Sequence, residues 1–232
     1  MPAKTCIVTG ASRGIGRETS KSLAEAGHHV ITVARSENPL HELQDQYPQR
    51  ISAFTADLTE QEDLKSLVKH IRSKFEGVQV LINNAGGLIN KPFKDLTDKD
   101  WHAMLDANLM TAVQITRSLL PYFADDAHIV NISSMGGYQG SAKFPGLTAY
   151  SVAKGGLSIL TECLAAELSD RNICCNALCL GMVQTDMLEE AFPGVEAPVT
   201  GQEMGDYIRH FALEGRKFYN GKILPVALQD PE

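Results

Sequence analysis

Apolar runs of four to eight residues recur along the chain and predict strands. The runs, of which the last is weak, are Thr5–Thr9, His29–Ala34, Ile51–Thr55, Val80–Asn83, His128–Ile132, Ile173–Leu180 and Lys222–Val226. They are nearly continuous in apolar character instead of alternating with polar residues, which is typical of parallel strands buried on both faces. We therefore expect a parallel sheet with a packed layer on each side.

Longer stretches between these runs carry the apolar spacing of three or four residues that is typical of amphipathic helices. They cover about Gly14–Ala26, Pro39–Tyr47, Glu60–Phe75, Thr97–Leu120 and Ala149–Leu168. For the third helix we expect Thr59 to be the N-cap and Glu62, three residues later, to complete a capping box.

The regular alternation of strands and helices defines the fold class. It predicts an α/β fold, a Rossmann-type doubly wound parallel sheet of about seven strands with helices on both faces. No repeat, low-complexity tract or linker divides the 232 residues, so we expect one domain over residues 1–232, with a small substrate lobe at about 182–215. In such sheets ligands bind beside the carboxyl ends of the strands. Functional residues should therefore follow the strands.

Composition and charge exclude several classes of protein. With 44% hydrophobic and 21% charged residues, the chain has the make-up of an ordinary globular protein. No apolar run approaches the roughly 20 residues of a membrane span, the N-terminus lacks signal-peptide architecture, and residues 229–232 are no recognisable sorting tail. A net charge of −7 disfavours nucleic-acid and anionic-membrane partners. We expect a cytoplasmic protein with neither partner.

The five cysteines, an odd number, argue against a disulfide framework. Cys174, Cys175 and Cys179 lie close in sequence, but no Cys-x-x-Cys or His-x-x-x-His nearby supplies further metal ligands. We therefore expect buried, reduced thiols and no metal site.

The first strand is followed by the glycine-rich segment Thr9–Gly16, which opens a helix. Gly10 permits a tight turn, while Gly14 and Gly16 allow the backbone to approach a pyrophosphate at the helix N-terminus. Alone, this spacing also fits a glycine-rich turn without a ligand. The same residues spell Gly-x-Ser-x-Gly, the elbow of a hydrolase with Ser12 as nucleophile. However, the histidines that a hydrolase would need lie at strand starts or in helical patterns.

Tyr150 and Lys154 are four residues apart at the start of a helix, so they share one helical face. A phenol with a pKa near 10 is a poor general base at neutral pH. An ammonium about 4 Å away lowers that pKa if the pair is partly desolvated. An exposed tyrosine with an unrelated lysine would show the same spacing.

Taken together, these motifs resemble the short-chain dehydrogenase/reductase family over nearly the whole chain. The ordered motifs are Thr9–Gly16, Asp57, Asn83-Asn84-Ala85-Gly86, Asn108, Ser133-Ser134, Tyr150-x-x-x-Lys154 and Gly181 with Thr185. The resemblance implies an oxidoreductase that transfers a hydride between NADP(H) and a small carbonyl or alcohol substrate. It does not identify the substrate.

The resemblance implies a role for each of four catalytic residues. Tyr150 would be the general acid in reduction and the base in oxidation. Lys154 would lower the pKa of Tyr150 and hold the nicotinamide ribose. Ser134, which starts a Ser-x-x-Gly pattern, would bond the substrate oxygen, and Asn108 would organise the proton relay. Hydride transfer to a carbonyl develops negative charge on oxygen, which needs such donors.

Further residues would surround the cofactor, with Asp57 at the adenine, Asn83 and Gly86 beside the cofactor and Thr185 at the carboxamide. The implied cofactor-binding residues are Gly10, Ser12, Arg13, Gly14, Ile15, Gly16, Arg35, Asp57, Leu58, Asn83, Ala85, Gly86, Tyr150, Lys154, Gly181, Val183 and Thr185.

The end of the second strand indicates which cofactor is bound. NAD(H) binding would place an acidic side chain there for the ribose 2′-hydroxyl, whereas this sequence has Ala34, Arg35 and Ser36. Arg35, together with Arg13, suits the 2′-phosphate of NADP(H). Solvated surface arginines would look the same, and Glu37 keeps NAD(H) open as the less favoured cofactor.

Three features depart from the family pattern. Leu180 replaces the proline expected before Gly181, and the interval from Ser134 to Tyr150 is longer than usual. We expect the extra residues, in the region Gly136–Thr148, to form a flap beside the substrate site. The tail beyond Met187 is short, so we expect an open site or one that a neighbouring subunit completes.

In this family the fourth and fifth helices pair with those of another subunit. Both helices here have more apolar residues than one sheet face needs: Trp101, Met104, Leu105, Leu109 and Val113, and Val152, Leu157, Leu160 and Leu164. We expect a homodimer or homotetramer. An alternative function is that of a catalytically idle NADPH-binding sensor or scaffold, but a pure binder has no use for intact Ser134, Tyr150 and Lys154.

Overall fold

Within residues 2–228, which a computed structural model of the chain describes, seven parallel strands form one sheet in the order β3-β2-β1-β4-β5-β6-β7. Met1 and residues 229–232, including the tail in which we expected no sorting signal, lie outside the described residues. The strands are β1 Thr5–Thr9, β2 His29–Ala34, β3 Ile51–Thr55, β4 Val78–Asn83, β5 Phe123–Ser134, β6 Cys174–Leu180 and β7 Ile223–Val226. The predicted doubly wound parallel sheet is confirmed.

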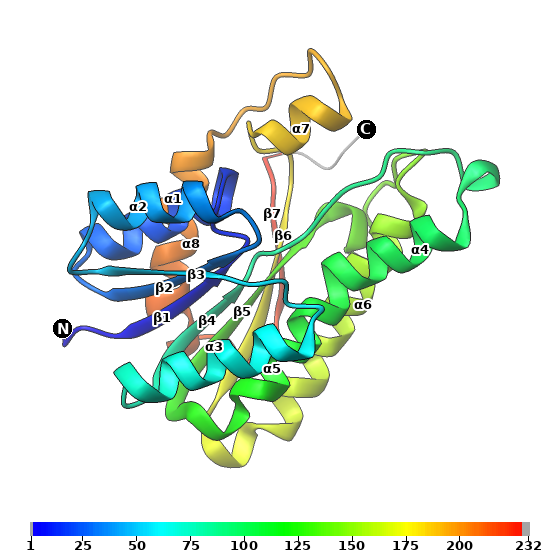
Figure 1. The fold of residues 1–232 in the computed structure, drawn as a ribbon. Helices are drawn as coiled ribbons and strands as arrows, with labels where there is room; N and C mark the ends of the chain where they lie inside the picture. Colours follow the sequence, from blue (N-terminus) through cyan, green and yellow to red (C-terminus); the bar gives the residue numbers. More distant parts are fainter. Residues whose placement is uncertain (1, 229–232) are drawn as a thin grey trace.

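Helices cover both faces of this sheet (Figure 1). One layer contains α1 Gly14–Glu25, α2 Glu37–Gln46 and α8 Gly201–Glu214, and the other contains α3 Gln61–Lys74, α5 Thr111–Leu119 and α6 Thr148–Glu167. The strand order reverses between β1 and β4, since the chain runs outward to β3 and then crosses back. At such a switch point the loops diverge and leave a crevice at the carboxyl ends of the strands.

The predicted helix Thr97–Leu120 is one helical run with a change of pitch in its middle. It consists of α4 Asp98–Leu105, a π-helical turn Asp106–Met110 and α5. π-Helical turns insert one extra residue into a helix and are frequent at functional sites. This turn carries Asn108, one of the residues expected to be catalytic.

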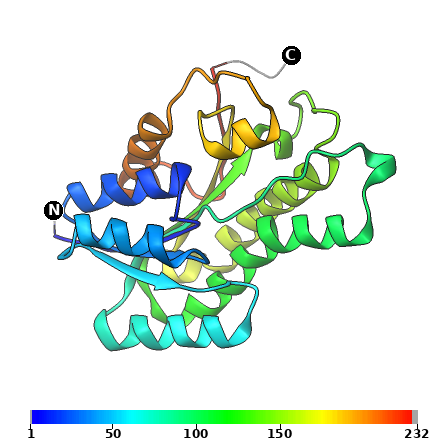
Figure 2. The same ribbon diagram turned by 45° about the horizontal axis from the view of Figure 1, so that its top comes forward.

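Two helices, α7 Asp186–Ala191 and α8, were not predicted. Figures 1 and 2 show α7 beyond the carboxyl ends of β6 and β7. By contrast, α8 packs on α1, and a Cβ at Gly205 would lie only 2.7 Å from the carbonyl carbon of Glu18. Of the expected lobe at about 182–215, the part before α8 lies over the strand ends, whereas α8 packs on α1 and reaches the cavity only through Met204.

The capping box expected at Thr59 and Glu62 is wrong. The N-cap of α3 is Glu60, one residue later, and its side chain makes no capping bond. The Thr59 hydroxyl donates to Asp57 Oδ1 at 2.7 Å instead of capping the helix. The same signature does cap α4, through Thr97 and Asp100, and α8, through Thr200 and Glu203.

The apolar side chains expected at a subunit interface divide into two groups. Met104 and Leu157 are buried within the subunit at 4% and 1% exposure, so they are not available to a partner. Val152 on α6 remains 51% exposed, and Ile159 on the same helix, which was not among the expected residues, is 61% exposed. Four cysteines are buried, whereas Cys163, also on α6, is exposed. No helix among residues 2–228 is both long and apolar enough to cross a membrane.

Candidate active site

A cavity of about 1700 Å³ lies at the carboxyl ends of the strands. Its walls come from the loops after β1, β2, β3, β4, β5 and β6, and from α4, α6 and α7. It is larger than the pockets that hold single drug-sized ligands. The switch point of the sheet thus leads into one continuous space in which most of the expected site residues meet.

The glycine loop after β1 forms the first wall. Gly10 and Gly14 adopt positive φ angles of 66° and 54°, a backbone region that glycine enters without strain. Ser12, Arg13 and Ile15 also line the cavity. Gly16 does not, because it faces the protein: a Cβ there would lie 2.4 Å from both Asn84 Nδ2 and the Gly10 carbonyl oxygen.

Hydrogen bonds join the glycine loop to the loop after β4. The Thr9 hydroxyl accepts from the backbone N–H groups of Asn84 and Ala85, at 3.0 and 2.9 Å. The amide of Asn84 donates to the Thr9 carbonyl at 3.0 Å. Ala85 and Gly86 line the cavity next to this junction. Asn84 and Thr9 were part of the sequence motifs, but they were not expected as site residues.

The structure does not bring Asn83 to the cavity. Its side chain is 3% exposed and lies under the sheet's helical layer, where Nδ2 donates to Asn131 Oδ1 at 2.8 Å and to Thr116 Oγ1 at 3.3 Å. Because successive side chains of a strand point to opposite faces, Asn83 and Asn84 cannot face the same space. The structure therefore does not place the Asn83 side chain in the cavity, where it was expected to lie beside the cofactor.

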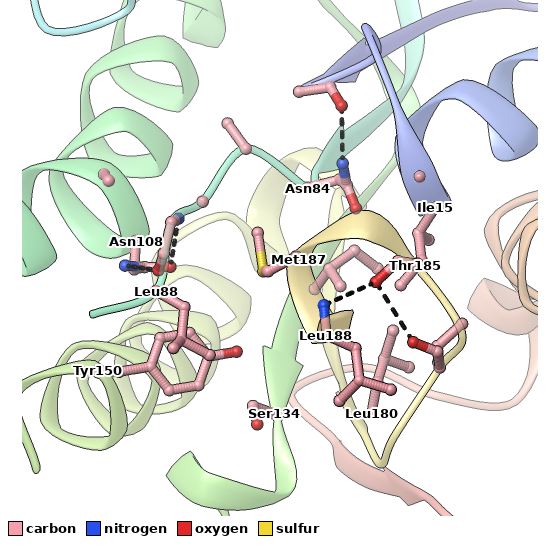
Figure 3. Close-up of a pocket in the computed structure, with 18 of the residues that line it drawn as sticks. Ile15, Asn84, Leu88, Asn108, Ser134, Tyr150, Leu180, Thr185, Met187 and Leu188 are labelled. Atoms are coloured by element: carbon pink, nitrogen blue, oxygen red, sulfur yellow. Dashed lines mark hydrogen bonds between the residues drawn. The ribbon is translucent and has the colours of Figure 1, made fainter. Parts of the chain in front are cut away.

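The four residues expected to be catalytic, Asn108, Ser134, Tyr150 and Lys154, all line this cavity. Figure 3 shows the Tyr150 hydroxyl pointing into the space between Ser134 and Leu188. The Ser134 hydroxyl accepts from the N–H of Gly136 at 3.1 Å, which leaves its proton free to donate. Ser133, in contrast, donates to the Lys154 carbonyl at 2.9 Å within the core. The geometry therefore favours Ser134 over Ser133.

Lys154 is a buried ammonium group with few protein partners. It is 4% exposed, and Nζ donates to the Ile132 carbonyl oxygen at 2.8 Å. Nζ lies 5.9 Å from the centre of the Tyr150 ring. Burial lowers the pKa of Lys154 to about 8. The ammonium can donate three hydrogen bonds, so it has capacity for a ligand inside the cavity.

The pKa of Tyr150 is shifted in the direction opposite to that expected from Lys154. Burial raises the pKa of the phenol, and the Ser134 hydroxyl lowers it by less. The physical reason is that the phenol is withdrawn from water, while Nζ of Lys154 donates to a carbonyl oxygen and not to the phenol. A raised pKa keeps Tyr150 protonated at neutral pH, which suits a proton donor.

Asn108 fixes the loop after β4 from within the π-helical turn. Its Nδ2 donates to the carbonyl oxygens of Gly87 and Met104, at 2.9 and 3.0 Å, and its Oδ1 accepts from the Gly87 N–H at 3.3 Å. A Cβ at Gly86 would lie 2.7 Å from Asn108 Oδ1 and 3.4 Å from Lys154 Nζ. Glycine is therefore required where the loop passes between these two side chains.

Arg35 and Asp57 stand at the other end of the cavity, after β2 and β3, with Leu58 beside them. Hydrogen bonds from Thr59 lower the pKa of Asp57, and the positive charge of Arg35 lowers it further. Arg35 is exposed and makes no salt bridge with another described residue. Arg13, from the glycine loop, instead bonds Glu190 of α7 at 2.5 Å.

The loop after β6 forms the roof. Leu180 is buried and pairs with Val226 of β7, and the Gly181 N–H donates to the Val226 carbonyl at 2.9 Å. Sheet pairing therefore holds this loop where the family pattern has proline. Val183 lines the cavity, and Thr185 caps α7 by accepting from the Leu188 N–H at 3.4 Å.

Part of the cavity wall comes from the segment Gly136–Thr148, which was expected to form a flap beside the substrate site, and part from Phe192, which was not expected at the site. Phe144 and Leu147, from the long segment before Tyr150, line the wall together with Phe192, which follows α7. The Phe144 and Phe192 rings lie 6.4 Å apart. No histidine is among the described residues that line the cavity, so a hydrolase with Ser12 as nucleophile would have no base there.

Comparison with known proteins places this arrangement in a family. The sequence profile of the family described as short chain dehydrogenase matches residues 4–196. The chain belongs to that family. The match covers the glycine loop, Asn108, Ser134, the Tyr150–Lys154 pair and α7, which are the parts that surround the cavity.

Several short-chain dehydrogenases from bacteria are similar in sequence to this one. A 3-oxoacyl-acyl-carrier-protein reductase from Thermotoga maritima is 31% identical over 195 residues, covering 82% of this chain and 78% of its own. The corresponding reductase from Aquifex aeolicus is 33% identical over 193 residues, covering 81% of this chain and 77% of its own.

Solved structures of two reductases share the fold of this short-chain dehydrogenase. The L-sorbose reductase of Gluconobacter frateurii, complexed with NADPH and L-sorbose, superposes with a TM-score of 0.88 at 24% identity and covers 99% of this chain and 97% of its own. A single-substitution variant of actinorhodin polyketide ketoreductase with NADPH gives a TM-score of 0.87 at 26% identity and covers 97% of this chain and 96% of its own.

Proposed function

We propose that this protein transfers a hydride between NADP(H) and a small carbonyl or alcohol substrate. The observation that carries the proposal is the meeting of Tyr150, Ser134 and the buried Lys154 in the cavity that begins at the glycine loop. A tyrosine hydroxyl, a serine hydroxyl and an ammonium group on one wall provide a proton donor, a hydrogen-bond donor and a positive charge. A protein that only binds a nucleotide could use Lys154 for the ribose but has no need of the two hydroxyl groups.

The residues present fit a dinucleotide. The N-terminus of α1 follows Gly10 and Gly14, which would present backbone N–H groups to a pyrophosphate. Lys154 has unused donors that suit ribose hydroxyls. At the far end, Arg35 would meet the 2′-phosphate and Asp57 the adenine. Support for NADP(H) over NAD(H) comes from Arg35 and from the two similar structures that contain NADPH.

The bound cofactor would supply the hydride, and the residues of this chain would manage the proton and the charge. As the carbonyl carbon gains the hydride, the oxygen gains an electron pair and takes the proton of the Tyr150 hydroxyl. Ser134 would donate a hydrogen bond to the same oxygen, which stabilises the developing charge. Lys154 would stabilise the resulting phenolate until Tyr150 regains a proton, and Asn108 would hold the loop that borders this relay.

We also propose a homodimer or homotetramer. Val152 and Ile159 leave an exposed apolar stripe along α6, and Met110 adds another exposed apolar side chain in the neighbouring π-helical turn. Light scattering at micromolar concentration tests this, since a monomeric mass would contradict it.

Isotope transfer tests the proposed reaction directly. The purified protein is incubated with NADPH that carries deuterium on one or the other face of nicotinamide C4, together with a panel of ketones and aldehydes. The expected result is NADPH consumption matched by alcohol formation, with deuterium on the carbinol carbon from one face only. NADPH consumption without deuterated alcohol, or no consumption with any carbonyl compound, would contradict the proposal.

A further inference from the structure

The outer half of the cavity has an apolar wall. Leu88, Phe144, Leu147, Leu188 and Phe192 all line the cavity that contains Tyr150, and Figure 3 shows Leu188 on the side to which the Tyr150 hydroxyl points. These side chains come from three segments: the loop after β4, the long segment before Tyr150, and α7 with the residue that follows it. A substrate that reaches Tyr150 therefore enters a cavity that these apolar side chains line.

Hydrogen bonds hold the three segments together around the mouth. The N–H of Lys91 donates to the Gly146 carbonyl oxygen at 2.9 Å, and Nδ2 of Asn90 donates to the Ala191 carbonyl oxygen at 3.1 Å. Gly146 has a φ of 89°, and a Cβ there would lie 2.2 Å from Asn90 Oδ1. These bonds fix the three segments relative to one another. The nearby polar side chain of Asn90 already donates its Nδ2 group to a backbone carbonyl oxygen.

The wall offers no partner to an anion. Among the described residues that line the cavity, the positively charged side chains are Arg13, Arg35 and Lys154. Arg13 is paired with Glu190 and Arg35 stands at the opposite end of the cavity. Lys154 donates to the Ile132 carbonyl oxygen, and its remaining donors are those proposed to bind the ribose. The lining also contains two acidic side chains from α7 and the segment after it, Asp186 and Glu196, and Asp186 lies 4.0 Å from Arg13. A carboxylate or phosphate on the substrate would lose its hydration without gaining a countercharge.

We propose, on the basis of the proposed function, that the substrates are uncharged ketones or aldehydes whose bulky apolar group packs against the paired rings of Phe144 and Phe192. The half-buried rings, 6.4 Å apart, provide the contact area that aromatic or branched aliphatic groups bury. Polyhydroxylated carbonyl compounds and keto acids are poor substrates, because a wall without free polar groups leaves their hydroxyls and charges unpaired. Phe144 and Phe192 are the specificity-determining residues.

A matched pair of substrates tests the charge selectivity. Methyl 4-acetylbenzoate and 4-acetylbenzoate carry the same ketone on the same ring and differ in one negative charge. With saturating NADPH, kcat/KM is expected to be at least about tenfold higher for the ester. Dihydroxyacetone, small and polar, is expected to be reduced less efficiently than 2-butanone. Equal or better reduction of the acid or of dihydroxyacetone would overturn the inference.

Substitutions of Phe144 and Phe192 test whether these two residues determine the substrate specificity. Phe144→Ala and Phe192→Ala are each expected to lower kcat/KM for the ester about tenfold, with less than about threefold change for 2-butanone, which is too small to reach both rings. Phe218→Ala removes a ring that is 78% exposed and outside the cavity, and serves as the control. Phe192→Arg is expected to raise kcat/KM for the acid relative to the ester.

The outcomes separate this inference from the proposed function. If none of these carbonyl compounds is reduced, the proposed function and the inference both fail. If 2-butanone and the ester are reduced, but the acid is reduced equally well or the Phe144 and Phe192 variants match Phe218→Ala, the proposed function stands and only the apolar specificity fails.

Discussion

The guanidinium of Arg13 and the carboxylate of Glu190 form two hydrogen bonds, with Nη1–Oε1 at 2.5 Å and Nη2–Oε2 at 3.3 Å. The pair ties the glycine loop to α7, although the two residues are 177 positions apart. Hydrogen bonding from Arg13, together with its charge, lowers the pKa of Glu190, so the carboxylate stays ionised at neutral pH. The two N–H groups that Arg13 gives to Glu190, and the charge that this carboxylate neutralises, are therefore not fully available to a 2′-phosphate while the pair is intact.

Glu190→Gln should consequently strengthen NADPH binding. Because exposed ion pairs are weak, the expected gain in affinity is about two- to fivefold, with no gain for NADH, which lacks the 2′-phosphate. Fluorescence titration of both cofactors measures it. Glu189→Gln, on the same helix but without a contact to Arg13, is the matched control. An equal gain for NADH would show that Glu190 acts on something other than the 2′-phosphate.

Arg35→Asp should reverse the cofactor preference. The substitution removes the cation at the end of β2 and supplies the carboxylate that a ribose 2′-hydroxyl prefers. Because the variant loses a charge-assisted hydrogen bond to the phosphate, we expect its kcat/KM for NADPH to fall about 10- to 100-fold. We expect its kcat/KM for NADH to rise. The matched control is Lys69→Asp, which makes the same charge reversal at an exposed position of α3 outside the cavity. Wild-type efficiency that is equal for both cofactors would refute the assignment.

NADPH affinity should fall at alkaline pH. Burial lowers the pKa of Lys154 to about 8, and only the protonated amine donates all of its hydrogen bonds to a ribose. Kd for NADPH is thus expected to rise as pH increases through about 8. Lys154→Arg keeps its charge throughout this range and should abolish the dependence. A wild-type Kd that is constant from pH 7 to pH 9, roughly one unit on each side of that pKa, contradicts this role.

His128 should make the fold sensitive to acid. Its Nδ1 lies 3.0 Å from the Ala212 carbonyl oxygen and its Nε2 lies 2.9 Å from Asn176 Nδ2, so the buried ring is held neutral. Burial lowers the pKa of His128 to about 4. The unfolded chain, with an ordinary histidine pKa of about 6.5, binds this proton first as pH falls, and the folded state loses stability between about pH 6.5 and 4.

Integrated over that window, His128 accounts for a loss of roughly 3 kcal/mol in the free energy of unfolding. Urea unfolding of the wild type at pH 7, 6 and 5 measures the slope. His128→Gln is expected to be less stable at pH 7 but to lose less stability on acidification, whereas His41→Gln, at an exposed position, should behave as the wild type does. Parallel pH profiles for wild type and His128→Gln would refute the role.

Most of the fold could be predicted from the sequence because the strands are buried on both faces. β1, β2 and β3 begin and end at the predicted residues. The helix α8 could also have been found, since Met204, Ile208, Phe211 and Ala212 repeat at helical spacing after the Thr200 cap. The π-helical turn at Asn108 was out of reach, because it changes the pitch of a helix without changing the apolar pattern.

The site residues that belong to motifs directly after strands could be predicted from the sequence. The contacts between segments that are distant in the sequence could not. Thr9, Asn84 and Gly86 lie in recognisable motifs. Asn83 and Asn84 are neighbours in one motif, and the sequence does not show which of the two side chains the backbone directs toward the cavity and which it buries. The contact of Phe144 with Phe192 joins two segments that follow different strands. No pattern within either segment indicates the other, and the same holds for Arg13 and Glu190.

The turnover and NADPH affinity of Tyr150→Phe provide the most direct test of the central claim. If Tyr150 donates the proton, its loss should lower kcat for carbonyl reduction at least about 100-fold, while Kd for NADPH changes less than about threefold. Tyr219→Phe, which removes a hydroxyl outside the cavity, should keep full activity. A Tyr150→Phe variant that turns over as the wild type does would contradict the account and favour a protein that binds NADPH without using it.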